Sequence, residues 1–459
     1  MFCQHCGTAS SPDQKFCKHC GATIVAPEGA QQVQSAAPPS APQTLPPGAI
    51  PVPPAGAYPP PSGTSFAAMP GVVYQGAAQA FHYVSPQAAA VAHSIQQTKL
   101  LHSLTDRIQS LASTESLEGF SLLQMFSEVF KRRGSEAVED YILVGTDRST
   151  PPIELIETGW PKPWLFFRLL AALIIAYVGL TVLFMQTGNT NCVPGMMFLG
   201  AFAVPLATLT LFFEFNTPRN VSLHVVGKLF LFGAVASLAV ALLGYSLPIF
   251  DYATMEAGIV EEVAKLLTVV VVMRSIRYKY ILNGVLFGAT VGAGFAAFET
   301  AGYALNEGLL PGLLAPILQA GSAAQAVYGP AMHQGVVAML QILRLRGILT
   351  PLGHVAWTAL SAGAFWRVKM GRPTSITMLF DHRFLKAFII PVALHAIWDA
   401  PIQLPFLGNQ IITGLITWYV VFGLVQQGLR QVKEEQRLKL ESTLATVQAS
   451  LQAQPVLSA

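Results

Sequence analysis

Long apolar runs constrain this chain more than any other feature of its sequence. From Pro161 onward, runs of about 18 or more mostly apolar residues recur. Only 11% of all residues are charged, whereas soluble domains carry about 25%. Such a run crosses a bilayer as a helix, because a helix satisfies all of its backbone polar groups internally. The sequence therefore predicts an all-α polytopic membrane helix bundle. Its net charge of +3 gives no reason to expect nucleic-acid binding.

We expect about eight spans. They are roughly 163–186, 194–215, 222–246, 254–273, 281–304, 350–367, 384–402 and 408–428. Basic residues favour the cytoplasmic side, and Arg219 and Lys279 are among those that mark inner ends. Eight spans in a cell membrane place both termini in the cytoplasm. Residues 305–349 do not fit this count, because Arg344 and Arg346 would then lie outside. A re-entrant pair, a surface helix and a ninth span all stay open for them.

The N-terminal residues predict a small metal-binding unit. Two Cys-x-x-Cys pairs lie within residues 1–24, formed by Cys3, Cys6, Cys17 and Cys20. Four thiolates close a tetrahedral zinc site and leave no open position for chemistry. We therefore expect a structural zinc in an N-terminal zinc ribbon. Because Lys15 and Lys18 are its few basic residues, we expect the ribbon to bind a protein rather than a nucleic acid.

The rest of the chain divides by composition. Residues 25–93 are rich in Pro, Ala, Gly and Gln, which predicts a disordered linker. Residues 94–135 carry apolar residues at helical spacing between charged ones, and 139–156 resemble an extended lead-in to the bilayer. We therefore predict a cytoplasmic amphipathic helical region over 94–156. The membrane domain covers 157–430, and 431–459 form a cytoplasmic tail.

Three charged residues lie close together in the middle of the predicted span 254–273. They are Glu261, Glu262 and Lys265. Each ionised group at mid-bilayer costs about 2.5–3.5 kcal/mol on insertion scales, so the group needs partners or a task. Residues four apart share a helix face, and Glu261 can therefore pair with Lys265 while Glu262 points into the bundle.

Later spans carry further isolated polar groups. Glu299 follows Phe295 by four residues, and a Gly-x-Gly step before it permits close helix approach. His354 begins the predicted sixth span. His395 and Asp399 are four apart in the seventh, so they share a face, and an Asp there can orient the imidazole.

These motifs together resemble the PrsW family of intramembrane proteases, within the Abi/CAAX-type membrane endopeptidases. The matching motifs are Glu261-Glu262-x-x-Lys265, Phe295-x-x-x-Glu299, Gly353-His354 and His395-x-x-Trp398-Asp399, in the family order. The resemblance covers about 160–430. Thr300 stands where the family often has Asn, and the family core lacks the ribbon and the linker.

The resemblance implies glutamate-type hydrolysis of a peptide bond in or near the bilayer, without a catalytic metal. Its substrate would be a membrane-anchored protein, such as an anti-sigma factor. We expect Glu261 or Glu262 to activate water, with a preference for Glu262. His354 and His395 would donate to the developing oxyanion. Asp399 would orient His395, Glu299 would tune a pKa or hold a second proton, and Lys265 would set the charge of the glutamate pair.

Three other functions compete with this interpretation. Glu299, His354, His395 and Asp399 offer the donors of a zinc metalloprotease, although no His-Glu-x-x-His motif is present. A non-enzymatic membrane sensor or scaffold would recruit a partner through the ribbon. A transporter with a buried proton relay would also place carboxylates and imidazoles at mid-depth, but we find no repeat between the two halves of the sequence.

Overall fold

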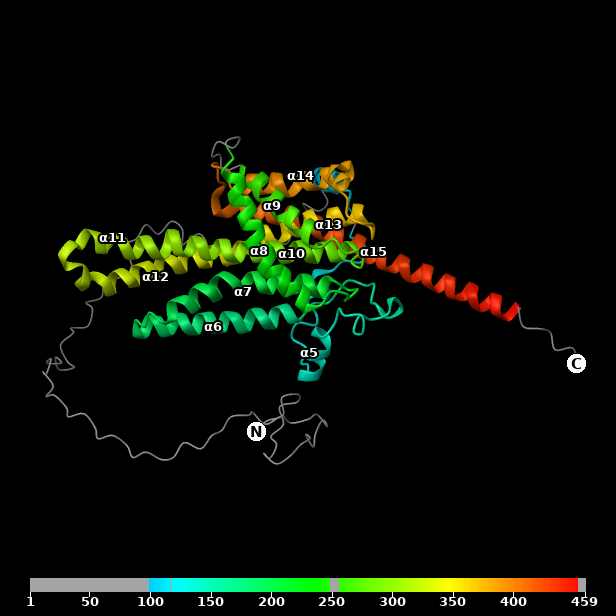
Figure 1. Ribbon diagram of the computed structural model, residues 1–459, viewed down its shortest axis with the longest axis horizontal. Helices are drawn as coiled ribbons and strands as arrows, with labels where there is room; N and C mark the ends of the chain where they lie inside the picture. Colours follow the sequence, from blue (N-terminus) through cyan, green and yellow to red (C-terminus); the bar gives the residue numbers. More distant parts are fainter. Residues whose placement is uncertain (1–98, 116, 248–255, 453–459) are drawn as a thin grey trace, which may run out of the picture. The chain divides into compact units, whose positions relative to one another are not determined.

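The computed structural model describes residues 99–115, 117–247 and 256–452, all of which belong to one compact unit. Every regular element in these residues is a helix (Figure 1). The predicted zinc ribbon at 1–24 and the predicted linker at 25–93 lie outside the described residues.

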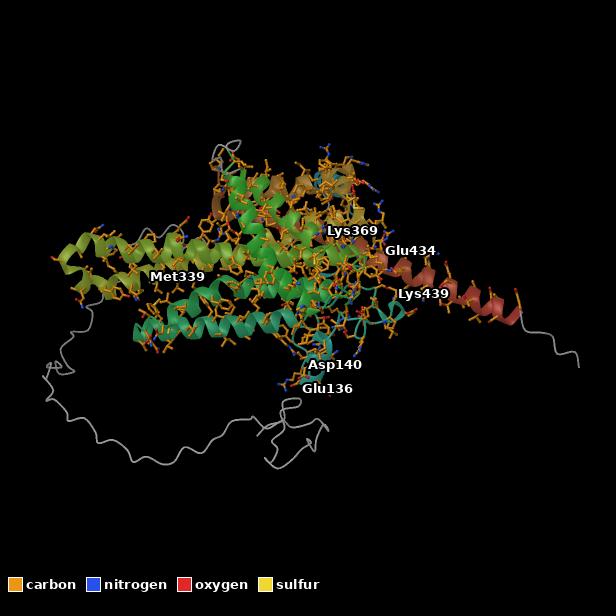
Figure 2. The ribbon with its side chains drawn as sticks, in the orientation of Figure 1. Glu136, Asp140, Met339, Lys369, Glu434 and Lys439 are labelled. Carbon is orange, nitrogen blue, oxygen red and sulfur yellow. The ribbon has the colours of Figure 1, made fainter. Side chains whose placement is uncertain are left out.

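Short helices precede the long apolar ones. They are α3 (Lys99–Ala112), α4 (Leu122–Met125), α5 (Ser135–Ile142) and a 3-10 turn, η1 (Ile153–Leu155). Helices were expected over 94–135 from the spacing of apolar residues, whereas the end of α5 and η1 lie in 139–156, where an extended segment was expected. On α5, Glu136 and Asp140 are exposed and project away from the neighbouring helices (Figure 2). The cytoplasmic location of this region stays a prediction.

A helix occupies the place of each of the eight predicted spans. These helices are α6 (Leu165–Thr187), α7 (Cys192–Phe215), α8 (Leu223–Tyr245), α9 (Glu256–Val272), α10 (Ile281–Tyr303), α13 (His354–Lys369), α14 (His382–Trp398) and α15 (Gly408–Gln452). Five helical runs in the described residues are long and apolar enough to cross a membrane, namely α6, α7, α8, the run 281–369 and the run 405–450.

The count of eight is therefore not established. Both α9 and α14 have 17 residues, or about 26 Å at 1.5 Å per residue, slightly less than a hydrocarbon core of about 30 Å. By contrast, α15 continues well beyond the predicted end of its span. The labelled Glu434 and Lys439 mark this outer part, so the tail predicted from 431 begins as a helix (Figure 2).

Residues 305–349, whose arrangement was left open, form a helical hairpin. A π-helical turn, η2 (Ala304–Leu309), leads into α11 (Leu310–Ala320), and α12 (Ala324–Leu349) returns alongside it (Figure 1). Gly312 and Gly335 face each other at the contact, which allows the two backbones to approach closely. Neither a lone surface helix nor a single ninth span describes this arrangement.

Helix α10 lies at the centre of the bundle and packs against α7, α8 and α13. Every residue from 281 to 297 is buried. Gly284, Gly288 and Gly292 recur every fourth residue along the face toward α13, and a methyl group added at Gly288 would overlap the Thr358 carbonyl. Small residues at this spacing let two helices approach closely, so His354 at the start of α13 is carried close to α10.

A buried carboxylate fixes the start of α6. Glu214, near the end of α7, accepts hydrogen bonds from the backbone N–H groups of Trp164, Leu165 and Phe166 at 2.7, 2.9 and 2.9 Å. Free N–H groups at a helix N-terminus favour a negative partner. Although Glu214 belongs to an apolar helix, its charge therefore has a structural partner there.

Candidate active site

Helix α9 places Glu261, Glu262 and Lys265 toward the interior of the bundle. Lys265 Nζ lies 2.5 Å from Glu262 Oε1 and 3.6 Å from Glu261 Oε2. Its side chain is fully buried, and the ammonium also lies 4.6 Å from the centre of the Phe295 ring. The sequence favoured pairing of Lys265 with Glu261, but the shorter contact is with Glu262.

The two histidines meet from different helices. Their ring centres are 5.0 Å apart, and Trp357 stacks on His395 at 4.4 Å. Gly258 on α9 lies against the backbone of α14 at Val392. This contact holds α14, and with it His395, close to the α9 glutamates.

Both nitrogens of His395 face carboxylates. Its Nδ1 lies 3.1 Å from Glu262 Oε1, and its Nε2 lies 3.2 Å from Asp399 Oδ2. A ring between two acceptors donates from both nitrogens, as an imidazolium does. The pairing of His395 with Asp399 that the sequence predicted is present.

His354 has one donor and one acceptor as neighbours. Lys265 Nζ lies 3.0 Å from its Nδ1, and Glu299 Oε2 lies 3.0 Å from its Nε2. A charged ammonium only donates, so His354 accepts at Nδ1 and carries its proton at Nε2, which faces the Glu299 carboxylate. These contacts assign the neutral tautomer protonated at Nε2.

Glu261 faces the space between the two rings. Its Oε2 lies 3.8 Å from His354 Nδ1 and 3.8 Å from His395 Nε2. Tyr245, at the end of α8, donates a hydrogen bond of 2.9 Å to its Oε1. Within the part of the chain that the structure describes, Glu261 Oε2 is buried and has no hydrogen-bond partner.

A cavity of about 440 Å³ opens onto these groups. Its wall includes five predicted site residues, namely Glu261, Glu299, His354, His395 and Asp399. Glu262 and Lys265 do not line it and are fully buried behind it. All seven predicted site residues thus belong to one connected cluster, but Glu262, preferred for activating water, does not reach the open space.

Two residues of this cluster, Tyr245 and Arg346, were not predicted as site residues from the sequence. Tyr245 lies at the last turn of a predicted span, where a tyrosine usually serves as an interfacial anchor. Arg346, read only as a topology marker, reaches from α12 to Glu299 Oε2 at 2.6 Å and lies 4.3 Å from the centre of the Tyr303 ring. The sequence could have indicated this role, because an arginine within an otherwise apolar segment needs a charged or polar partner.

The fold and the site together define a helical membrane protein with a buried acid–imidazole centre of the kind that serves hydrolysis. Residues 221–425 match the model of the PrsW family of intramembrane metalloproteases. Over this segment the chain is similar to a family of membrane proteases. The matched segment contains every group of the cluster, including Tyr245 and Arg346. No curated protein and no solved structure matches the chain.

The family description names a metal, and three residues of the cluster fit one. Glu261, His354 and His395 each offer a ligand atom, and these atoms lie within 4.8 Å of one another. A carboxylate and two imidazoles are a donor set that zinc takes in hydrolytic enzymes. The buried Glu261 Oε2, which lacks a hydrogen-bond partner among the described residues, also fits a missing ligand. Against this, the Lys265 ammonium lies 3.0 Å from His354 Nδ1 and competes for that nitrogen.

Proposed function

We propose that this protein hydrolyses a peptide bond of a membrane-anchored protein substrate, and that the Glu261 cluster is its reaction centre. The observation that carries the proposal is Glu261 Oε2, which accepts no hydrogen bond from the described residues and lies 3.8 Å from both imidazoles at the wall of the cavity. The Lys265 ammonium lies 3.6 Å from the same oxygen. Water enclosed by these groups has an acceptor for its proton, and the His395 imidazolium supplies positive charge beside a peptide carbonyl placed there.

Glu261, rather than Glu262, acts as the general base. Its Oε2 takes a proton from water while the water oxygen bonds to the peptide carbonyl carbon. The C–N bond then breaks, and the protonated Glu261 returns the proton to the leaving amine nitrogen. The Tyr245 hydroxyl holds Oε1, so that one oxygen of the carboxylate is fixed and the other stays available. Fixed catalytic groups lower the entropy cost of the reaction.

His395 faces the developing oxyanion. Held between Glu262 and Asp399 as an imidazolium, it presents positive charge at Nε2, 3.8 Å from Glu261 Oε2. Such preorganised charge is usually the largest catalytic contribution. Glu262 and Lys265 neutralise each other behind the cavity and keep the cluster compact.

A divalent metal is the second candidate arrangement, and the donor set of Glu261, His354 and His395 favours it. When bound, such an ion would supply Lewis acidity and a water of lowered pKa. In that arrangement Glu299 would orient His354 from its Nε2 side and Glu262 would orient His395 from its Nδ1 side, as carboxylates behind metal-bound imidazoles do.

The wider setting is part of the proposal. We place both termini in the cytoplasm of a cell membrane with about eight spans, and we assign a structural zinc to Cys3, Cys6, Cys17 and Cys20. The ribbon then binds a protein, and the substrate is a membrane-anchored regulator, of which an anti-sigma factor is one example. Accessibility labelling of a cysteine added at either terminus tests the orientation.

The decisive experiment compares Glu261→Gln with Glu307→Gln. Glu307 is exposed in the π-helical turn, outside the cluster, so it controls for the loss of one carboxylate. Membrane proteins of cells that express the wild type or either variant are compared by mass spectrometry of new peptide ends. We expect cleavage with the wild type and with Glu307→Gln, and none with Glu261→Gln. Cleavage that survives Glu261→Gln in folded protein contradicts the proposed role.

Metal analysis separates the two arrangements. The full chain with all four N-terminal cysteines changed to Ser is measured for bound metal, with and without His395→Ala. If the Cys-to-Ser protein binds one equivalent of metal and the added His395→Ala change abolishes this binding, the metal arrangement is assigned. Active protein without metal assigns the arrangement in which Glu261 and His395 act alone.

A further inference from the structure

A short segment before α6 exposes large apolar side chains. In residues 121–133, Leu123 is 89% exposed and Phe130 is 84% exposed. Leu122 and Phe126 are exposed as well. Met125 and Val129 are instead buried in the protein, so the segment is anchored on one side and apolar on the other. Apolar side chains gathered in this way mark an interaction surface.

The first turn of α6 fixes where this surface lies. Phe126 packs on Phe166 with ring centres 5.8 Å apart, and Phe130 packs on Phe167 at 5.4 Å. Helix α6 has 23 residues, and only 6% of its most apolar 18-residue stretch is buried in the protein. At 1.5 Å per residue it is about 34 Å long, just enough to cross a core of about 30 Å. Its first turn therefore lies at a membrane interface, and the exposed side of 121–133 continues its lipid-facing surface.

The polar end of the segment is basic. It carries Lys131, Arg132 and Arg133 against a single acid, Glu128, which pairs with Lys131 and Arg133. Arg132 is exposed, and the Lys131 side chain is 66% exposed. On α6, the Arg168 guanidinium donates to the Lys131 carbonyl at 2.6 Å, which adds another cation at the same level. Basic groups beside exposed Phe and Leu are typical of a segment that lies in an interface containing anionic lipid.

We infer that residues 121–133 are a membrane docking segment. Leu122, Leu123, Phe126 and Phe130 insert into the lipid beside α6, while Lys131 and Arg132 contact anionic headgroups. The partner is the bilayer interface itself. The segment thus holds the part of the chain before α6 against the membrane surface, independently of any catalytic role of the cluster.

Photocrosslinking in lipid nanodiscs tests this inference. Phe130 of the full chain is replaced by p-benzoylphenylalanine, irradiated in nanodiscs of mixed phosphatidylcholine and phosphatidylglycerol, and analysed by intact mass. The control carries the same replacement at Leu444, which is 55% exposed on the outer part of α15. We expect a mass increase of one lipid at position 130 and none at position 444. An unmodified position 130, or a protein adduct there, overturns the inference.

The charge component has its own measurement. The phosphatidylglycerol share of the adducts at position 130 should exceed the phosphatidylglycerol share of the nanodisc lipid. Each basic residue near the surface should raise the local ratio of anionic to neutral lipid roughly fivefold. Changing Lys131 and Arg132 together to Gln should return the adducts to the bulk lipid ratio without abolishing them. A bulk ratio already present with the wild-type basic residues overturns the proposed contact with anionic headgroups.

Discussion

The contact between α9 and α14 gives the sharpest test of the site geometry. A methyl group added at Gly258 would lie 2.6 Å from the Val392 carbonyl oxygen, whereas ordinary contacts begin at 3.4 Å. Gly258→Ala must therefore move the two helices apart by about 0.8 Å. Because His395 Nδ1 is now 3.1 Å from Glu262 Oε1, the same movement stretches that hydrogen bond beyond about 3.5 Å, where little of it remains.

We expect Gly258→Ala to lower the cleavage rate by about 100-fold, the size expected for a misplacement of about 1 Å. Overpacking at this contact should also lower the free energy of unfolding by about 1–3 kcal/mol. The matched control is Gly227→Ala on α8, where an added methyl group meets nothing within 4 Å. The assay follows the wild-type cleavage product over time, alongside thermal unfolding in detergent. Wild-type cleavage by folded Gly258→Ala would refute the reasoning.

Three further predictions concern single contacts. Arg346→Met removes the 2.6 Å ion pair to Glu299. Leaving that partly buried carboxylate without its cation costs about 1–3 kcal/mol, so kcat should fall about 10- to 100-fold. An unchanged kcat would exclude a positioning role. Tyr245→Phe removes the hydrogen bond to the Glu261 carboxylate and should lower kcat about tenfold with KM unchanged. A change in KM alone would assign Tyr245 to substrate binding. The side-chain hydrogen bond from Arg383 holds the pKa of Asp381, at the N-terminus of α14, well below its usual range. A carboxyl whose folded pKa is depressed stabilises the protein above its unfolded pKa of about 3.9 and loses this contribution as the pH falls. Unfolding of the wild type and of Asp381→Asn should therefore differ at neutral pH and converge in acid, and a constant difference would contradict the pairing.

The positions of most helices followed from composition, because an apolar run in lipid has few alternatives to a helix. The same argument did not fix the number of spans. Helices α9 and α14 have only 17 residues each and carry polar groups, so neither is long and apolar enough to be a clear span. Residues 305–349 were ambiguous for a related reason. Their apolar pattern does not distinguish a hairpin from a single span, and only the packing of α11 on α12 decides between them.

By itself, the sequence determined which residues needed partners. Seven ionisable groups in apolar surroundings are costly wherever they lie, and their spacing and order were sufficient to identify the PrsW family. Only the tertiary structure decided which group faces the cavity. Glu261 and Glu262 are adjacent in the chain, yet helix rotation of about 100° per residue sends one to the open space and the other to Lys265. Tertiary packing also places Tyr245 and Arg346 at the site. Local sequence spacing does not show which residues of other helices will be neighbours.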